Sequence, residues 1–499
     1  MSKPFFITTA IDYSTGKLHV GHLYEKTIAD VLARIHHLNG EKVFFSTGVD
    51  IHGEKVLEKA KEENLSPEAY TSQKIIEFKK FSENALISFD DFIHTGEERH
   101  IKSAQFFFQK MVDNGDIYSG EYEGWYYPYE ETFVTDSELE NDPFWKDKKS
   151  ELKKVKESTY FFRWGKYQKK LEEWYGKSES NVFPSFRKKE MLEFMKKGLK
   201  DISFTRKNLS WGVPSPIDES HTIYVWGDAL VNYLTVCGYP DEKYKDFWPA
   251  DVHLVGLDIN RFHSLLWPAM LLSAGIELPK QILVHGFVND NNGEKMSKSK
   301  GNVVDPEEII PKFGIEPIRY YLLRETPLGS DLSFSIKQLV ARNNGELADG
   351  FGNLVNRVHS MLEKYFDSTI PDSPLDESII SESNGYSESS KQFFLSHDIL
   401  NGLTQAWKIV DLANKHITDK EPWKLMKNNK KEEVSRLLVS EIELIRKIAI
   451  LVSPILPLSA EKIRKQFGFP AFLFSDLNKP KSFSGKKVNK QGILFAKLE

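Results

Sequence analysis

A strand–helix–strand pattern at the start of this 499-residue chain constrains its fold more than any other feature. An apolar run over residues 5–9 is followed by helical spacing of apolar residues over 22–39, and then by a second apolar run over 42–46. Residues 54–64 again have the spacing of a helix. Strand, helix and strand in this order predict a βαβ unit with a parallel sheet.

The α/β pattern stops near Tyr118 and returns after Gly212. The stretch between them is rich in aromatic residues and then in lysine. Beyond it, residues 252–256 and 281–284 have the composition of buried strands, with a helix predicted over 261–273. One sheet that carries an insertion explains this order better than two separate α/β domains.

Strand signals fade beyond about Asp331. Residues 352–366, 399–416 and 433–452 have helical periodicity, which predicts a helical C-terminal third. We expect the Ser-rich stretch at 367–390 to be a long loop within this helical part.

Composition excludes several classes of protein. No apolar run approaches the roughly 18 residues that a membrane-spanning helix needs, and the N-terminus lacks the pattern of a signal peptide. Cys237 is the only cysteine, which excludes an intrachain disulfide and every Cys-based metal site. A reducing compartment, the cytoplasm, fits best. The net charge of −5 neither indicates nor excludes a nucleic-acid partner, since binding depends on a local basic face.

The sequence His19-Val20-Gly21-His22 lies where the first strand leads into its helix. A helix N-terminus offers unpaired N–H groups and positive dipole to a phosphate, and Gly21 lets a ligand approach the backbone. The imidazoles of His19 and His22 can donate to the phosphate as charge builds. The alternative is two surface histidines at a helix cap.

A second motif, Lys295-Met296-Ser297-Lys298-Ser299, follows a strand that ends near Val288. Lysines three residues apart, with small hydroxyl residues between them, suit a loop that closes on a polyphosphate. Alone, this run would more readily be a basic surface loop. Both motifs, however, follow strands of one inferred sheet, and ligands bind at the carboxyl ends of such strands.

With these two motifs the chain resembles the class I aminoacyl-tRNA synthetases and, among them, the methionyl-tRNA synthetase family. The segments that carry the resemblance are 8–13, 47–53, 122–126, 224–229, 256–268 and 285–306. The resemblance implies an α/β fold with a Rossmann-like parallel-sheet catalytic domain, an inserted connective domain and a C-terminal α-helical anticodon-binding domain.

The implied domain boundaries follow the changes in pattern. The catalytic domain would take residues 1–117 and 213–300, the inserted domain 118–212, a linker domain 301–345 and the anticodon-binding domain 346–499. The insertion is too short for the editing domain of the isoleucine, valine and leucine enzymes. A monomer is expected, because the extra C-terminal tRNA-binding module of some members is not apparent.

The resemblance implies a methionine–tRNA ligase that acts in translation initiation and elongation. Methionine and ATP would give methionyl-adenylate and pyrophosphate, and the methionine would pass to the terminal adenosine of initiator and elongator tRNA(Met). His19, His22, Lys295 and Lys298 would be the catalytic residues. The full nucleotide site would comprise His19, Gly21, His22, Gly256, Asp258, Lys295, Ser297 and Lys298. Mg²⁺ would accompany the ATP without a dedicated protein cage.

For the methionine, the resemblance assigns Asp50 to the α-amino group. The side chain would be surrounded by Ile11, Tyr13, Trp226, Ala229, Leu230, Tyr233, Ile259 and His263. The spacing of Trp226, Ala229 and Tyr233 predicts one helical face, which fits an apolar, polarizable pocket. A hydrogen bond from Tyr13 or His263 to the thioether would reject leucine. If the family resemblance is set aside, a role in core packing is as plausible for Trp226 and Tyr233 as a role in methionine binding, and it is more plausible for His263.

For the anticodon, the resemblance assigns Asn353, Arg357 and Trp423. Tryptophan stacks on unstacked bases, while asparagine and arginine bond their edges. If the family resemblance is set aside, the simpler interpretation is that Trp423 packs between helices and that Asn353 and Arg357 are exposed helix residues.

The chain departs from the family in its inserted domain. Tyr127 and Glu130 stand where many members have zinc-binding cysteines, so we expect no structural zinc and no other metal site. The region 118–154 would fold around aromatics instead: Trp125, Tyr126, Tyr129 and Phe133. Leu230 stands where some members have proline, which would alter the pocket modestly.

Three other functions remain as alternatives. A sister synthetase is the nearest, although the cysteine enzyme would need zinc-binding thiols. A non-catalytic tRNA-binding paralogue would have no need for both phosphate motifs. A small-molecule nucleotidyltransferase would share these motifs but not the helical C-terminal third.

Overall fold

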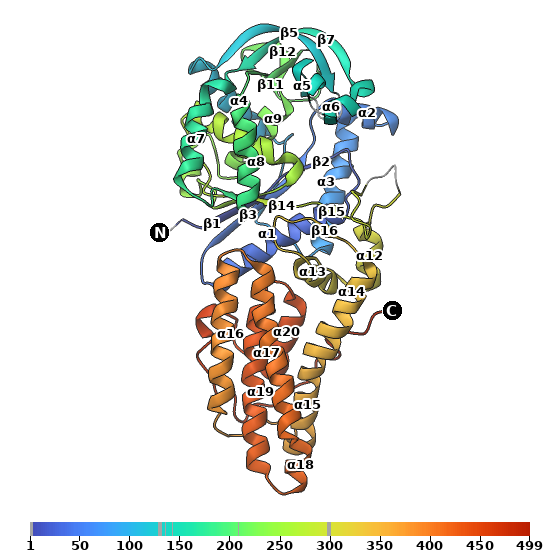
Figure 1. The fold of residues 1–499 in the computed structure, drawn as a ribbon, viewed down its shortest axis with the longest axis vertical. Coiled ribbons are helices and arrows are strands. Elements are labelled where there is room, and N and C mark those ends of the chain that lie inside the picture. The colour runs from blue at the N-terminus through green and yellow to red at the C-terminus, as the bar shows by residue number, and fades with distance from the viewer. Residues whose placement is uncertain (1–2, 128–131, 135, 142, 208, 297–300) are drawn as a thin grey trace. The chain divides into compact units, whose positions relative to one another are not determined.

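The strand–helix–strand order predicted at the start of the chain is present in the computed structural model (Figure 1). It comprises β1 (Phe5–Thr9), α1 (Val20–Leu38) and β3 (Val43–Asp50). The apolar side chains that predict the helix are buried, and Gly40 follows α1 with a φ of 84°, a conformation that glycine adopts readily.

The structure describes residues 3–127, 132–134, 136–141, 143–207, 209–296 and 301–499. The chain divides into two compact units. The first unit comprises Met1–Leu18, Phe44–Glu83 and Ser88–His285, and the second unit comprises His19–Val43, Asn84–Ile87 and Gly286–Glu499.

One seven-stranded sheet forms the centre of the first unit. Its strands are β1, β2 (Asp12–Tyr13), β3, β4 (Asp91–His94), β8 (Val182–Phe183), β13 (Val252–Gly256) and β14 (Ile282–His285). The order is β2-β3-β1-β13-β14-β8, with β4 on β3, and β1 pairs in parallel with β13. The prediction of one sheet interrupted by an insertion is therefore confirmed.

Two further sheets are antiparallel, and their strands lie between residues 117 and 223, partly inside and partly beyond the predicted insertion. Four strands follow the order β6-β5-β7-β9: β5 (Ile117–Tyr127), β6 (Thr132–Val134), β7 (Lys153–Phe162) and β9 (Ile202–Ser203). A three-stranded sheet contains β10 (Thr205–Lys207), β11 (Pro214–Ser215) and β12 (Asp218–Ile223). Tyr127 packs edge-on against Trp145 in a small apolar cluster with Val134 and Leu139.

Helices accompany these sheets in the first unit. They are α2 (Glu54–Glu62), α3 (Pro67–Asn84), α4 (Glu98–Asp113), α5 (Asp136–Asn141), α6 (Pro143–Asp147), α7 (Gln168–Lys177), α8 (Ser185–Lys196), α9 (Val225–Ala229), α10 (Asn232–Thr235) and α11 (Trp267–Ala274). Shorter helical turns are η1 (Lys149–Glu151), η2 (Trp164–Tyr167), η3 (Glu242–Asp246), η4 (Leu257–Ile259) and the π-helical η5 (Phe262–Leu266).

The second unit is mainly helical. Besides α1 it contains α12 (Pro306–Phe313), α13 (Ile315–Arg324), α14 (Ile336–Arg342), the π-helical η7 (Asn343–Gly352), α15 (Asn353–Phe366), α16 (Glu377–Leu395), α17 (Ile399–Lys420), α18 (Pro422–Lys427), α19 (Lys431–Val452), α20 (Pro457–Phe467) and η8 (Phe474–Asp476). Two short parallel strands, β15 (Val288–Asn289) and β16 (Leu332–Ser333), precede most of these helices. In Figure 1, α16, α17 and α19 run side by side, and the expected α/β class with a helical C-terminal part is confirmed.

The prediction of a loop over residues 367–390 is wrong, because α16 occupies most of that stretch. Asp376 caps the helix by accepting from the backbone N–H of Ser378. The serines that suggest a loop are instead its inward face: Ser383, Ser387 and Ser390 are fully buried. Their small side chains allow close packing, and Ser390 donates to the carbonyl of Gly402 in α17 at 2.7 Å.

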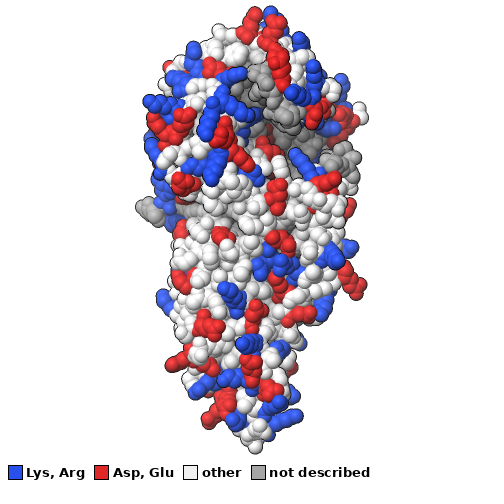
Figure 2. All heavy atoms as spheres, viewed as in Figure 1, with Lys and Arg blue, Asp and Glu red and all other residues white. Residues whose placement is uncertain are grey.

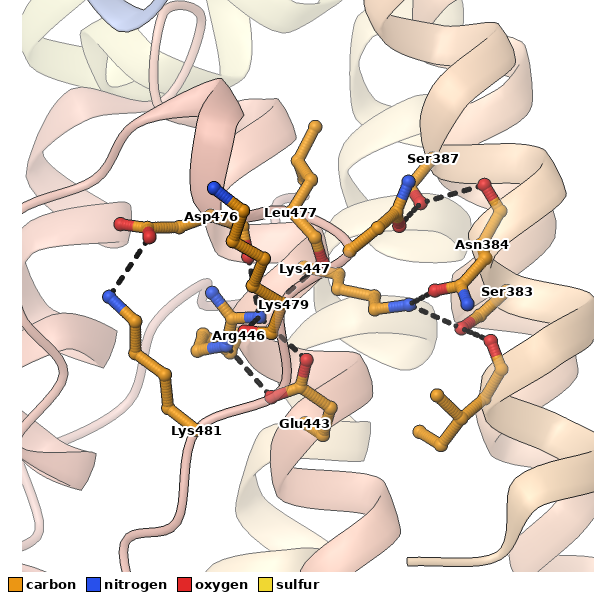
Figure 3. Close-up of polar contacts among 12 residues, drawn as sticks. Ser383, Asn384, Ser387, Glu443, Arg446, Lys447, Asp476, Leu477, Lys479 and Lys481 are labelled. Atoms are coloured by element: carbon orange, nitrogen blue, oxygen red, sulfur yellow. Dashed lines mark hydrogen bonds and ion pairs between the residues drawn. The ribbon is translucent and has the colours of Figure 1, made fainter.

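Buried charges attach the C-terminal segment to this bundle (Figure 3). Arg446 of α19 forms a bidentate pair with Glu443 at 2.6 and 2.8 Å, and it donates to the carbonyl of Asp476 at 2.9 Å. Lys447 points the other way and donates to Ser383 of α16 at 2.9 Å. Burial lowers the pKa of Lys447 to about 8. The charged edge of α19 thus joins two neighbouring segments of the chain.

A second buried charge connects α1 to the helical part of the same unit. Arg319 of α13 is fully buried and donates to the Asp30 carboxylate at 2.5 Å. Its other N–H groups donate to the carbonyls of Ala85, Pro454 and Ile455 at 3.0–3.1 Å. Because every one of these groups is bonded, the cost of burying the guanidinium is offset.

We expect Arg319→Met to lower the free energy of unfolding by about 3 kcal/mol, because it removes the buried cation bonded to Asp30 and takes a donor away from three carbonyls. Urea denaturation followed by circular dichroism measures this. Arg436→Met, at an exposed position of α19, is the matched control and should change stability by no more than ~0.5 kcal/mol. Equal effects of the two substitutions would contradict the role of the buried pair.

Candidate active site

Asp50 lies at the carboxyl end of β3 and is 4% exposed. Its Oδ1 accepts hydrogen bonds from the Thr95 hydroxyl at 2.9 Å and from the backbone N–H of His52 at 3.1 Å. No described residue bonds its Oδ2. Burial, and then the charge of Asp228, raises the pKa of Asp50 to about 7. A buried carboxylate with one oriented, unpartnered oxygen is suited to bind a cation.

Most of the apolar residues expected around the methionine side chain belong to one cluster in the first unit. Leu230 and Tyr233 are buried in it, and Ile11, Trp226 and Ile259 pack against it. Ala229 is also buried. Tyr13 packs in a different cluster, with Val56 and Tyr70, although it pairs directly with Asp50 in the sheet.

The expected single helical face is present in a modified form. The chain forms α9 and α10 with a tight turn at Leu230 and Val231 between them, and His263 lies in the π-helical η5. The Tyr233 hydroxyl and His263 Nε2 are nevertheless 2.7 Å apart. His263 Nδ1 lies 3.0 Å from the carbonyl of Ile259, so it carries a proton and donates, while Nε2 faces the Tyr233 hydroxyl.

Trp226 forms a wall beside this histidine. Its ring stacks on Phe262 with centroids 4.0 Å apart and planes 8° apart, and it meets His263 edge-on at 5.9 Å. The stacking fixes the indole plane, because both rings are held by short helical segments. Aromatic faces arranged in this way suit an uncharged, polarizable side chain.

His253 is a buried residue of this region that sequence reasoning missed. It lies on β13 under the Tyr233 ring, with centroids 4.3 Å apart. Its Nε2 is 3.3 Å from the Trp267 indole N–H, which can only donate, so Nδ1 carries the proton and donates to Thr8 at 2.7 Å. Burial lowers the pKa of His253 well below its ordinary value. The sequence does not indicate a role for His253 in the site, because the residue lies within a run that predicts an apolar strand.

A polar network beside Asp50 was also missed. Asp228 of α9 accepts from His52 at 2.6 Å and from His100 at 2.7 Å, and all three are buried. Two members stand inside segments that carry the family resemblance, residues 47–53 and 224–229. The family resemblance therefore includes these two residues, but the spacing of apolar residues in the same segments indicates only their neighbours.

In the second unit, His19 and His22 cap α1 together. His19 Nδ1 accepts from the backbone N–H of Gly21 at 3.1 Å, and His22 Nδ1 accepts from that of His19 at 3.1 Å. Both neutral rings therefore carry their proton on Nε2 and present a donor there. A Cβ on Gly21 would lie 2.8 Å from His19 Cε1, so a side chain at this position would displace the His19 ring from its cap.

The two phosphate motifs are linked within the second unit. The backbone N–H of Val20 donates to the carbonyl of Val304, just beyond the second motif, at 3.1 Å. Lys295 lies over the Phe287 ring at 4.8 Å. Ser297 and Lys298 lie outside the described residues. The chain after the second motif thus contacts the helix N-terminus that carries the first.

Gly256 ends β13 and is buried, whereas Asp258 is exposed. A Cβ on Gly256 would lie 2.8 Å from Asp258 Oδ1 and 3.6 Å from the His285 ring. The absent side chain keeps the carboxyl end of this strand open, where ligands bind in parallel sheets.

The residues expected to read the anticodon lie on two helices that both pack on α19. Asn353 is exposed and Arg357 half-buried on α15, and Trp423 is 40% exposed on α18. Arg357 faces the charge of the buried Glu441, whose pKa burial raises to about 7. On the face in Figure 2, basic side chains are interspersed with acidic ones.

Among the residues that the structure describes, no three His, Cys, Asp or Glu side chains gather where they could hold a metal ion. Tyr127, at one expected knuckle position, donates to Glu151 at 3.2 Å, while Glu130 and Tyr129 lie outside the described residues. No described helix is both long enough and apolar enough to cross a membrane.

Comparisons with known proteins agree on one family. The model described as tRNA synthetases class I (M) matches residues 5–151 and 141–359. The methionine–tRNA ligase of Caldanaerobacter subterraneus subsp. tengcongensis is 40% identical over 509 residues, covering 100% of this chain and 80% of that protein. The Bacillus subtilis methionine–tRNA ligase is 39% identical over 520 residues, covering 99% and 78%. The structure of Mycobacterium tuberculosis methionyl-tRNA synthetase in complex with methionyl-adenylate matches with a TM-score of 0.93 and 35% identity, covering 99% of both chains.

We expect His253 to stay neutral in the folded protein between about pH 8 and about pH 5, because charging it would break its contact with the Trp267 indole. Long-range ¹⁵N spectra of histidine-labelled protein should show a protonated Nδ1 throughout this range. The same residue should titrate normally in urea. A folded-state titration near 6.5, the ordinary value, would contradict this assignment.

Proposed function

The chain belongs to the family of class I tRNA synthetases (M), and we propose on this basis that it is a methionine–tRNA ligase. The family that the sequence motifs indicate is confirmed by the matches over the whole chain. The reaction joins methionine to ATP as methionyl-adenylate with release of pyrophosphate, and then transfers methionine to the terminal adenosine of tRNA(Met). The Mycobacterium tuberculosis relative carries that adenylate in its complex.

The observation that carries the proposal is the buried Asp50 carboxylate, whose Oδ2 has no described partner, in the unit that also contains the Trp226–Tyr233–His263 cluster. Asp50 would bind the ammonium group of methionine. The aromatic cluster would contact its thioether without charge, as a sulfur ligand prefers. Tyr13 would supply the hydrogen bond that rejects leucine. The two nitrogens of His263 are bonded to Ile259 and Tyr233, so His263 would instead hold the Tyr233 ring in place.

The phosphates of ATP would be bound by residues of the second unit. His19 and His22 each present an Nε2 donor at the N-terminus of α1, where the helix dipole favours an anion. Lys295, with Lys298, would neutralise the leaving pyrophosphate. Neither step needs a protein nucleophile, because the methionine carboxylate attacks the α-phosphorus itself. Orientation and charge stabilisation therefore supply the rate.

The helical C-terminal part would bind the anticodon. Trp423 would stack on an unstacked base, and Asn353 and Arg357 would bond base edges. The exposure of Trp423 supports this role, since a packing anchor would be buried. Initiator and elongator tRNA(Met) would both be substrates.

Four further features belong to this proposal. Mg²⁺ would accompany ATP, bound mainly through the phosphates. The inserted domain would need no zinc, and the apolar cluster of Tyr127, Trp145 and Leu139 would hold this region together instead. The protein would act as a monomer in the cytoplasm.

Amino-acid-dependent ATP–pyrophosphate exchange, run with all twenty amino acids and without tRNA, tests the proposal. We expect exchange with methionine alone. Tyr13→Phe and His263→Gln should each reduce the preference for methionine over leucine. Exchange with another amino acid would overturn the pocket assignment, and no exchange with any would favour a non-catalytic tRNA-binding protein.

We expect Trp423→Ala to lower kcat/KM for tRNA(Met) about tenfold or more, since a stacked base contributes about 1–3 kcal/mol. Pyrophosphate exchange should not change. Phe186→Ala, at a similarly exposed aromatic residue on α8 of the first unit, is the matched control and should leave both activities intact. A parallel loss of exchange and charging in Trp423→Ala would show that Trp423 only stabilises the fold.

A further inference from the structure

We propose that Asp228, His52 and His100 form a positioning network in which His52 offsets the negative charge of Asp228, so that the charge of Asp50 is the one left for the ammonium group of methionine. The inference rests on the proposed function, because it assumes that Asp50 binds this group. None of the three residues would touch methionine. They would act through Asp50, which lies two residues before His52 in the chain.

The hydrogen bonds of Asp228 define the network. The carboxylate is 1% exposed, and each of its oxygens faces one imidazole nitrogen: Oδ2 faces His52 Nδ1 at 2.6 Å and Oδ1 faces His100 Nε2 at 2.7 Å. A carboxylate only accepts, so both rings present N–H groups to it. The other nitrogen of His100 lies 3.3 Å from the Thr235 hydroxyl, which fixes the ring from behind.

Two buried carboxylates in one region would normally oppose each other's ionisation. Burial raises the pKa of Asp228, but the charge of His52 and the hydrogen bonds from both histidines outweigh it and hold that pKa at about 2. Burial lowers the pKa of His52, but Asp228 and Asp50 outweigh it and raise it. These opposite shifts favour a charged His52 beside a charged Asp228, and the charges of such a pair cancel, so that the net charge of the three groups is that of Asp50.

One negative charge matches one ammonium group. The charge of Asp228 raises the pKa of Asp50, and the charge of His52 lowers it. The other neighbours of Asp50 are the Thr95 hydroxyl and the backbone N–H of His52, which both stabilise its ionised form. His94 is a further titratable group of this region: the charges of His52 and His100 act on it, as do those of Glu97 and Lys79. Among the residues that the structure describes, His52 is thus the cation whose charge lowers the pKa of Asp50.

The network predicts a pH dependence for methionine. Only ionised Asp50 binds ammonium, so kcat/KM for methionine in the exchange reaction should decrease below about pH 7, by up to about tenfold per pH unit. We call this decrease the acid limb of the pH profile. The KM for ATP should show no such limb. His52→Gln removes the positive charge and keeps the negative one, so the limb should move to higher pH by about half a unit or more, roughly threefold in kcat/KM on the acid side.

The double variant His52→Gln with Asp228→Asn removes both charges and should return the limb towards its wild-type position. A purely structural role cannot produce this rescue, because each substitution adds a defect. Asp116→Asn is the matched control: Asp116 is another fully buried carboxylate of the first unit, bonded by Lys166, Tyr167 and Ser273. It should lower stability without moving the limb.

A measurement on the unmodified protein avoids any folding defect. Calorimetric titration of methionine in buffers of different ionisation enthalpy should show release approaching one proton at about pH 6 and little release at about pH 8. A limb that stays in place in His52→Gln, a double variant without rescue, or binding without proton release at about pH 6 would each overturn the inference. Absence of methionine-dependent exchange in the wild type would instead overturn the proposed function.

Discussion

The candidate site depends on the parallel pairing of β1 with β13. This register places Thr8 opposite His253, and the hydrogen bond between their side chains ties segments 245 residues apart. Because neighbouring strands run in the same direction, the chain after each strand leaves the sheet at the same edge. Asp50 at the end of β3 and Gly256 at the end of β13 therefore lie at the edge where a ligand of such a sheet binds.

Charge compensation is the second organising feature. A buried ion without a partner costs several kcal/mol, so the buried charges of this protein occur in bonded sets. Arg319 is bonded to Asp30, Arg446 to Glu443, and Asp228 to two histidines. Asp50 and Glu441 differ, because described residues bond only one oxygen of each carboxylate. Of the two, Asp50 lies at the carboxyl end of a strand of the parallel sheet, where a substrate cation would complete the set.

The sequence predicted the regular elements well, because helical and strand periodicities reflect burial on one face. It failed for α16, where small polar residues form the buried face. Serine is typical of loops, but between closely packed helices it occupies little volume and bonds a neighbouring carbonyl, as Ser390 does with Gly402. Apolar periodicity cannot register a buried face of this kind.

The amino-acid order alone predicts the α/β fold class, the helical C-terminal third, the family and the two phosphate motifs. Each of these depends on local spacing or on residues adjacent in the chain. The partners of buried polar groups do not follow from it. His52, His100 and Asp228 stand up to 176 residues apart, and only the packing of α4 and α9 beside the sheet brings their side chains together. The same holds for Tyr233 and His263, since hydrogen bonds between distant segments are selected by the folded chain and leave no periodic trace in the sequence.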